Sequence, residues 1–262
     1  FEFTLERIVS PLIAAGHISI VSPLIAAGHI SDGISPAKYD DRKLRFNGVQ
    51  VSGQEIVVPL GVTCYQQFMA DTKRTPAENK FLQEMGERHH SEKYAHFARP
   101  IGVTVVPVSS DGSAFVGVRK NPYLRGLLMG AGGYVKFKHP EGFNPREDAL
   151  RELGEEFGIP ESRVREVAFV GISYLLNTGE TDFSFLAWVH EPDEYFTSDA
   201  WLRRATDIEH EHPLTQLSSW FEARKLASMD RSPSHLPMEY PAPAVYATRH
   251  ALLSIKTSEL RD

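Results

Sequence analysis

The sequence predicts an α+β protein in which a mixed β-sheet lies between helices and a β-rich extension precedes it. Two strand-like segments, 101–108 and 114–119, are joined by the turn-forming run SSDGS, which is a strong hairpin signal. A helix with start and stop signals at both ends follows at 145–157, and further strand-like segments come after it. This irregular alternation of strands and helices favours the α+β class.

Composition narrows the classes of function. A chain of 262 residues with a formal charge of −6 lacks the basic surplus of a nucleic-acid binder, although a local basic pocket can still hold one nucleotide. Cys64 is the only cysteine, which excludes an intrachain disulfide and a cysteine-based zinc site. No apolar run is long enough to span a membrane. We therefore expect an intracellular, cytoplasmic protein whose partner is a small nucleotide, with no nucleic acid or membrane partner, and a homodimer as the oligomeric state to test.

The N-terminal region carries a tandem repeat. The twelve residues IVSPLIAAGHIS at 8–19 recur at 20–31, so His17 and His29 occupy matching positions. Two copies are too few for a solenoid, which needs about three or more units to bury a shared core. The pattern favours a pair of short apolar strand-like segments over a two-histidine metal site.

Residues 1–98 form the predicted N-terminal extension, and 99–262 form the predicted main domain. Within the extension, the alternation of apolar and polar residues at 41–70 predicts a β-ribbon that leads into a helix near Thr63 or Tyr65. A second helix is expected from a Thr75 cap with Pro76 at its first position.

Three histidines close this second helix and follow it. His89, His90 and His96 show no fixed ligand spacing with a nearby carboxylate. The expectation is a solvated helix end rather than a metal site.

The remaining segments of the main domain are predicted from periodicity. Strands are expected at 167–176 and 182–190, separated by the turn NTGET. A short helix is expected at 214–225, and a last helix at about 243–255.

The helix at 145–157 has clear boundaries. Asn144 suits the N-cap, Pro145 suits the first position, and Glu147 at the third position predicts a capping box. Gly158 suits the left-handed position after the helix, and Pro160 prevents its continuation.

Two faces of this helix differ in chemistry. The first is apolar and should be buried; it consists of Ala149, Leu150, Leu153 and Phe157. The second is acidic and lies opposite; it consists of Asp148, Glu152, Glu155 and Glu156.

The acidic face should repel itself, because like charges three or four residues apart in a helix cost roughly 0.2–0.5 kcal/mol per pair. Arg151 is the basic residue among these carboxylates. A hard divalent cation such as Mg²⁺, or Mn²⁺, takes oxygen ligands and would relieve the repulsion. The alternative is a surface acidic helix without a ligand.

The segment RELGEEFGI at 151–159 resembles the second half of the Nudix box, whose full pattern is G-x5-E-x7-R-E-U-x-E-E-x-G-U with U apolar. The resemblance implies a Nudix fold in which Glu152, Glu155 and Glu156 bind metal and Arg151 orients them. The glycine run GAGG would supply the first glycine of the box as Gly133, whose backbone carbonyl can also contact the metal.

The first half of the box departs from the pattern. The distance from Gly133 to Arg151 is about four residues longer than in the family, and Phe143 stands where the upstream glutamate is expected. Glu141 is near that position but out of register.

The resemblance implies Mg²⁺-dependent hydrolysis of a nucleoside diphosphate linked to another group, by attack of water on phosphorus. The base is expected among the box glutamates or in the loop that holds Glu209, His210 and Glu211, with Glu211 preferred; a polar connecting loop is the alternative. Phosphate or sugar contacts are expected from basic residues at a strand end, namely Arg119, Lys120 and Arg125.

The substrate can be narrowed by a looser resemblance. Residues 44–255 are similar to the Nudix subgroup that hydrolyses UDP-glucose and UDP-galactose to UMP and sugar 1-phosphate. The alternatives are a diphosphatase for ADP-ribose, coenzyme A or dinucleotides, and a non-catalytic Nudix-fold module that binds nucleotide or protein. A structural protein with an acidic helix is a further alternative that the glycine run and hairpin disfavour.

Overall fold

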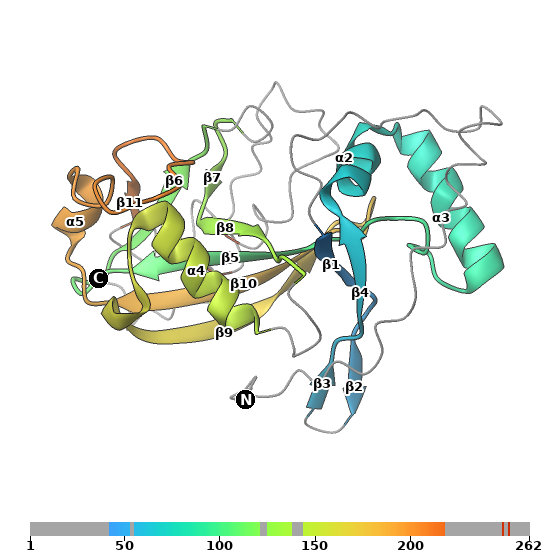
Figure 1. The fold of residues 1–262 in the computed structure, drawn as a ribbon, viewed down its shortest axis with the longest axis horizontal. Coiled ribbons are helices and arrows are strands. Elements are labelled where there is room, and N and C mark those ends of the chain that lie inside the picture. Colours follow the sequence, from blue (N-terminus) through green and yellow to red (C-terminus); the bar gives the residue numbers. More distant parts are fainter. Residues whose placement is uncertain are drawn as a thin grey trace. The chain divides into compact units, whose positions relative to one another are not determined.

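The chain folds into two units in the computed structural model, which describes residues 42–52, 55–120, 125–137, 144–217, 248 and 251 (Figure 1). The first unit comprises Phe1–Ile101, Tyr134–Phe143 and Tyr174–Thr181, and the second comprises Gly102–Gly133, Asn144–Ser173 and Asp182–Asp262. The expected division between residues 98 and 99 stays a prediction.

Several expectations concern residues outside the described ranges. They are the repeat at 8–31 with His17 and His29, the departures from the Nudix pattern at Glu141 and Phe143, and most of the helices expected at 214–225 and 243–255.

The β-ribbon predicted at the start of the first unit is confirmed. Strand β1 (Arg42–Phe46) pairs antiparallel with β4 (Leu60–Cys64), and β2 (Gln50–Ser52) pairs antiparallel with β3 (Glu55–Val57). The register sets Phe46 opposite Leu60. Both of these side chains are buried, as expected for the apolar positions of an alternating ribbon.

The two helices of the first unit begin where the sequence predicts. Helix α2 spans Tyr65–Lys73 and α3 spans Pro76–His90. Thr75 accepts a hydrogen bond from the backbone N–H of Glu78, and the Glu78 carboxylate accepts one from the Thr75 N–H. This reciprocal capping box satisfies two of the free N–H groups at the start of α3.

The histidine expectation holds for only part of the cluster. His89 and His90 are exposed at the end of α3, as predicted. His96 is instead buried, with the His90 ring edge-on to it at 5.1 Å between centroids. Its position in the segment after α3, next to the fully buried Phe97, explains the difference.

The second unit is built on a mixed β-sheet, which confirms the predicted α+β class. Its strands are β5 (Ile101–Val108), β6 (Ala114–Val118), β7 (Leu128–Met129), β8 (Ala131–Tyr134), β9 (Val164–Tyr174), β10 (Thr181–Val189) and β11 (Thr215–Leu217). The main path runs β11-β6-β5-β10-β9, with β7 pairing to β6 and β8 to β5. The hairpin predicted at 101–119 is therefore present as β5 and β6, which pair antiparallel.

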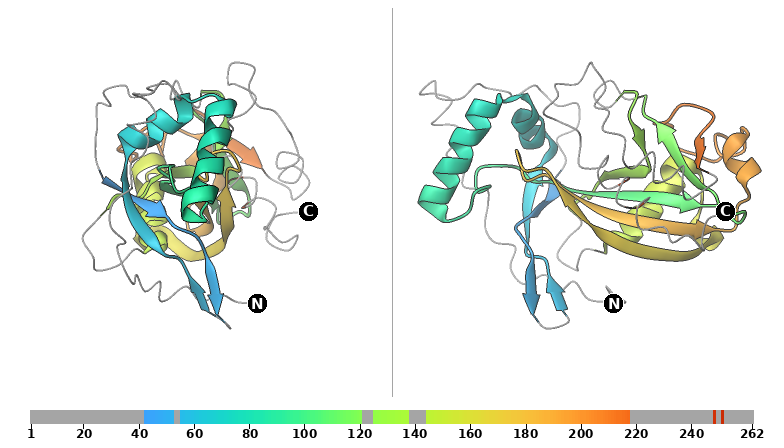
Figure 2. Two further views of the ribbon diagram at one scale, coloured as in Figure 1. Left: turned by 90° about the vertical axis from the view of Figure 1, so that its right-hand side faces the viewer. Right: turned by 180° about the vertical axis from the view of Figure 1, so that it is seen from behind.

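Helices and turns complete the described part of this unit. They are α4 (Pro145–Phe157), a 3₁₀ turn at Glu161–Arg163 and α5 (Asp193–Thr197). Helix α4 lies over one face of the sheet in each of the three views (Figures 1 and 2). No helix among the described residues is both long enough and apolar enough to cross a membrane.

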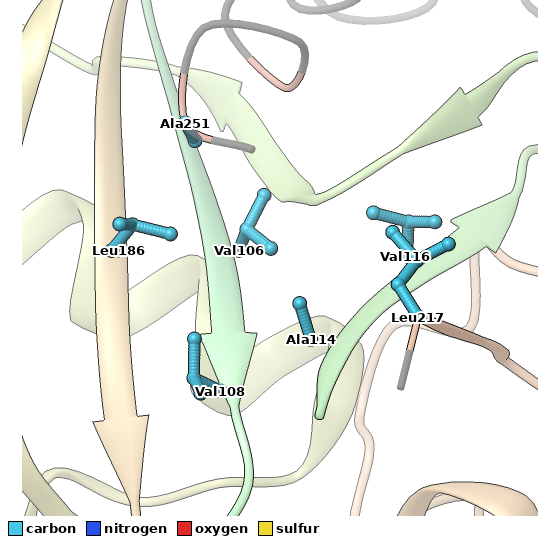
Figure 3. Packing of buried hydrophobic residues seen from close by; sticks show 7 residues of the cluster. All are labelled: Val106, Val108, Ala114, Val116, Leu186, Leu217 and Ala251. Atoms are coloured by element: carbon cyan, nitrogen blue, oxygen red, sulfur yellow. The ribbon is translucent and has the colours of Figure 1, made fainter. Parts of the chain in front are cut away.

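The helix predicted at 214–225 is wrong in its described part. Thr215–Leu217 form strand β11, which pairs antiparallel with Ala114–Val116 at the edge of the sheet. Leu217 packs into a buried apolar cluster, so a long-range partner overrides the local helical spacing. The cluster consists of Val106, Val108, Ala114, Val116, Leu186, Leu217 and Ala251 (Figure 3).

Candidate active site on helix α4

Helix α4 has the boundaries that its sequence predicts. The Asn144 side chain accepts a hydrogen bond from the Arg146 N–H, and Pro145 occupies the first helical position. Gly158 ends the helix in the left-handed conformation, with φ of 66°. Glu147 differs from the expected capping box, because its carboxylate accepts from the side-chain amide of Asn144 at 2.9 Å.

The apolar face of α4 is buried as predicted. Leu153 and Phe157 are fully inaccessible, and Ala149 and Leu150 are buried beside them. This face fixes the rotation of the helix and therefore the direction in which the carboxylates project.

The acidic face is more enclosed than a solvated helix face would be. Glu152 is 7% exposed and Glu156 is 2% exposed, and Asp148 is also buried. Glu155 lies at the edge, with 41% of its side chain exposed. Removing carboxylates from water is unfavourable unless they are paired, so the partners of this face are informative.

Arg151 is the first of these partners. Its guanidinium lies 2.7 Å from Glu152 Oε1, 2.7 Å from Glu155 Oε2 and 3.2 Å from Asp148 Oδ1. The repulsion predicted from the sequence is therefore offset in part by an arginine of the same helix. The repulsion between these carboxylates is therefore not in itself evidence for a bound metal ion.

Glu156 has a different set of partners. Arg119 Nη1 lies 3.1 Å from its Oε1, and His210 Nε2 lies 2.7 Å from its Oε2. Arg119, which is 6% exposed, forms a second ion pair with Glu209.

Burial dominates the ionisation of the site in spite of these partners. It raises the pKa of Glu152 to about 7 and that of Glu156 to about 7, although Arg151 and Arg119 respectively oppose the rise. Burial also lowers the pKa of His210 to about 3. The ring is therefore neutral near pH 7, and its Nε2–H donates to the ionised form of Glu156.

The glycine run supplies space beside the carboxylates. A Cβ at Gly133 would lie 2.5 Å from Oε1 of Glu152, and a Cβ at Gly132 would lie 2.4 Å from the carbonyl oxygen of Val103. The backbone of β8 can therefore approach both the neighbouring strand and the helix. Gly133 is the residue that the sequence assigns to the start of the Nudix box, and the structure places it against Glu152.

The predicted substrate ligands differ in accessibility. Lys120 and Arg125 are exposed, whereas Arg119 is buried between Glu156 and Glu209. Arg119 would have to exchange these partners to reach a phosphate, so its role in substrate binding stays a prediction. Glu211, the preferred base, is exposed and its backbone N–H donates to Val118; its role also stays a prediction.

Two buried residues near the site were not selected from the sequence. The first is His210, which forms an isolated antiparallel bridge with Arg119 at the end of β6 and is fully buried, whereas His212 of the same EHEH run is exposed. The second is Asp182 in β10, which is buried and whose Oδ1 has no hydrogen-bond partner. Burial raises the pKa of Asp182 to about 8, and the charge of Glu152 contributes to the rise. No short motif marks Asp182.

The donor set of α4 suits a hard cation in its chemistry. Carboxylate oxygens of Glu152, Glu155 and Glu156 with the carbonyl of Gly133 are the ligand types that Mg²⁺ and Mn²⁺ prefer. In the described ranges, however, no three His, Cys, Asp or Glu side chains are arranged to hold a metal ion. Glu152 and Glu155 are both turned to Arg151, so cation binding would require a change of partners.

Comparisons with known proteins return matches by structure alone. No family model matches the chain, and no curated protein matches it. A MutT Nudix hydrolase from Burkholderia pseudomallei is 19% identical and aligns over 60% of this chain and 98% of its own, with a TM-score of 0.36. A Nudix hydrolase from Nitrosomonas europaea is 20% identical over 51% of this chain and 81% of its own, with a TM-score of 0.34.

A third match is the Nudix domain of Shewanella oneidensis NrtR, solved in complex with ADP-ribose. It is 13% identical over 51% of this chain and 82% of its own, with a TM-score of 0.33. Likenesses this distant do not assign a function, which has to come from the residues of α4 and their partners.

Proposed function

We propose that the chain is a Mg²⁺-dependent pyrophosphohydrolase that cleaves a nucleoside diphosphate linked to a second group. The observation that carries the proposal is the enclosed carboxylate row of α4 beside the bare backbone of Gly133. Two of its glutamates have pKa values raised to about 7 even with arginine partners. A neighbouring divalent charge would favour their ionised forms, as nearby opposite charge does in general.

The residues that would hold Mg²⁺, or Mn²⁺, are Glu152, Glu155, Glu156 and the backbone carbonyl of Gly133. When bound there, the cation would neutralise oxygens of the diphosphate and make its phosphorus more electrophilic. Arg151 orients Glu152 and Glu155 by its hydrogen bonds and would keep them in reach of one another as they change partners.

The other roles concern the phosphates and the attacking water. Lys120 and Arg125 are exposed cations at the end of β6 and just before β7, and they are assigned to the outer phosphate or the sugar. A glutamate accepts the proton of the water as its oxygen bonds to phosphorus and the bridging P–O bond breaks. Glu211 is the preferred base, and one of the box glutamates is the alternative.

The substrate class to test first is a UDP-sugar such as UDP-glucose or UDP-galactose. Water would then convert it to UMP and sugar 1-phosphate with release of a proton. ADP-ribose, coenzyme A and dinucleotides are the alternative substrates of the same reaction.

A non-catalytic nucleotide-binding module is the second candidate function, and one observation favours it. Arg151, Arg119 and His210 already pair with carboxylates of α4. These partners offset the cost of burying the carboxylates, so the fold does not require a bound cation. Such a module would bind nucleotide without turnover.

A panel of substrates separates these functions. The full chain is incubated with Mg²⁺ and UDP-glucose, UDP-galactose, ADP-ribose, coenzyme A or NADH. Release of nucleoside monophosphate is followed, or of adenosine 3′,5′-bisphosphate in the case of coenzyme A. Turnover of one class identifies the substrate, and its loss on chelation of Mg²⁺ supports the metal requirement. Binding of a nucleotide without turnover would favour the module, and neither binding nor turnover would contradict both candidates.

A further inference from the structure

The Glu156 carboxylate is held at both of its oxygens. Arg119 Nη1 lies 3.1 Å from Oε1, and His210 Nε2 lies 2.7 Å from Oε2. Two protein donors, one on each oxygen, are therefore directed at this group. A carboxylate has about four lone-pair directions, so about one on each oxygen is left for another partner.

The chain places His210 against Glu156 through backbone pairing. The Lys120 N–H donates to Glu209 O at 2.8 Å, and the Glu211 N–H donates to Val118 O at 2.7 Å. These bonds hold the segment extended along the end of β6. Successive side chains then alternate in direction, and His210 turns inward to 0% exposure.

A glycine makes room for the imidazole. A Cβ at Gly117 would lie 2.3 Å from His210 Nδ1 and 2.4 Å from its Cγ, so no other residue fits here without displacing the ring. On another side the ring packs against Phe157 at 5.1 Å between centroids. The orientation of His210 is therefore fixed by packing as well as by its hydrogen bond.

His210 also prevents a competing arrangement. A guanidinium readily binds both oxygens of a carboxylate, and Arg119 is buried beside Glu156. The His210 ring is hydrogen-bonded to Oε2 of Glu156, and Arg119 contacts Oε1. Arg119 also forms an ion pair with Glu209. Without His210, Glu156 is free to rotate into a two-point ion pair with Arg119.

We propose that His210 is a positioning residue. It keeps Arg119 from binding both carboxylate oxygens of Glu156, so that Glu156 retains a lone pair for a divalent cation. This inference rests on the proposed function, because it assumes that Glu156 is a metal ligand. It assigns His210 no contact with substrate.

The test is the affinity for Mn²⁺ alone, measured from the electron paramagnetic resonance signal of free Mn²⁺ without substrate. His210→Ala should weaken Mn²⁺ binding by about 10- to 100-fold, which is the usual effect of removing a hydrogen-bond partner of a metal ligand. His210→Gln should recover most of the affinity, because its amide N–H2 can take the place of the Nε2–H. His210→Asn, whose amide is shorter, should not.

Controls separate positioning from general damage. His96→Ala removes another buried imidazole, in the first unit, and should leave Mn²⁺ affinity unchanged. Thermal unfolding of each variant reports on folding. If His210→Ala yields too little folded protein, the comparison of Gln with Asn still decides, since equal Mn²⁺ affinity of these two variants would overturn the inference.

Glu156→Gln distinguishes this inference from the proposed function. If Glu156→Gln weakens Mn²⁺ binding and His210→Ala does not, the positioning role is wrong and the metal role of Glu156 stands. If Glu156→Gln also binds Mn²⁺ as tightly as the wild type, the assigned metal site fails, and the positioning role fails with it.

Discussion

Arg151 and Arg119 between them contact the four carboxylates on the acidic face of α4. Arg151 contacts Asp148, Glu152 and Glu155, while Arg119 contacts Glu156. Arg151 lies three residues after Asp148 and four before Glu155, so these two contacts follow from helix geometry. Arg119 is 37 residues from Glu156 along the chain, so no local pattern could have placed it there.

Gly133 offers the sharpest test of the site at the scale of one residue. Gly133→Ala would put a Cβ at 2.5 Å from Oε1 of Glu152 and should displace that carboxylate. We expect roughly tenfold weaker Mn²⁺ binding, by analogy with other changes around metal ligands.

Gly154→Ala is the matched control. Its Cβ would meet nothing closer than 3.6 Å, and alanine is the better helix former by about 0.5–1 kcal/mol. This variant should keep its Mn²⁺ affinity and gain stability. Equal Mn²⁺ affinity of Gly133→Ala and Gly154→Ala would remove Gly133 from the site.

Elements with local signals were predicted well. Asn144, Pro145 and Gly158 mark the ends of α4, and the capping box of Thr75 marks the start of α3. Strand β11 was missed, because its structure depends on pairing with β6, about 100 residues earlier, where Thr215 lies opposite Val116. The same reason applies to Asp182 and His210, whose surroundings are made by distant segments.

The N-cap of α4 should contribute measurably to the stability of the protein. Asn144→Ala removes the acceptor for the Arg146 N–H and should lower the free energy of unfolding by about 1 kcal/mol. Asn144→Asp keeps an acceptor and places a negative charge at the helix N-terminus, so it should be close to wild type. Urea unfolding of the three proteins provides the comparison; an unchanged midpoint for Asn144→Ala would show that the cap contributes nothing.

For the whole molecule, acid stability depends on buried histidines. His96 is buried, and neither ring nitrogen has a hydrogen-bond partner. Burial lowers its pKa to about 4, the positive charges of His90 and His89 act in the same direction, and Glu92 opposes them. The unfolded chain thus binds the proton first as the pH falls.

This difference sets the sign of the pH effect. Between the unfolded value of about 6.5 and the folded value of about 4, stability is lost as the pH falls, on the order of 3 kcal/mol in total. His96→Leu removes the group and should flatten this part of the curve relative to wild type. Unfolding free energies measured from pH 7 to pH 4 test the prediction, and parallel curves for the two proteins would contradict it.

The glutamates of α4 are proposed to serve a metal-dependent hydrolysis of a diphosphate. The direct measurement is the rate of nucleoside monophosphate release with Mg²⁺, on the best substrate of the panel, for wild type, Glu156→Gln and Glu147→Gln. Glu147 is an exposed glutamate of the same helix and provides the control. We predict a loss of at least about 100-fold for Glu156→Gln and a rate near wild type for Glu147→Gln; equal rates for all three proteins would contradict the claim.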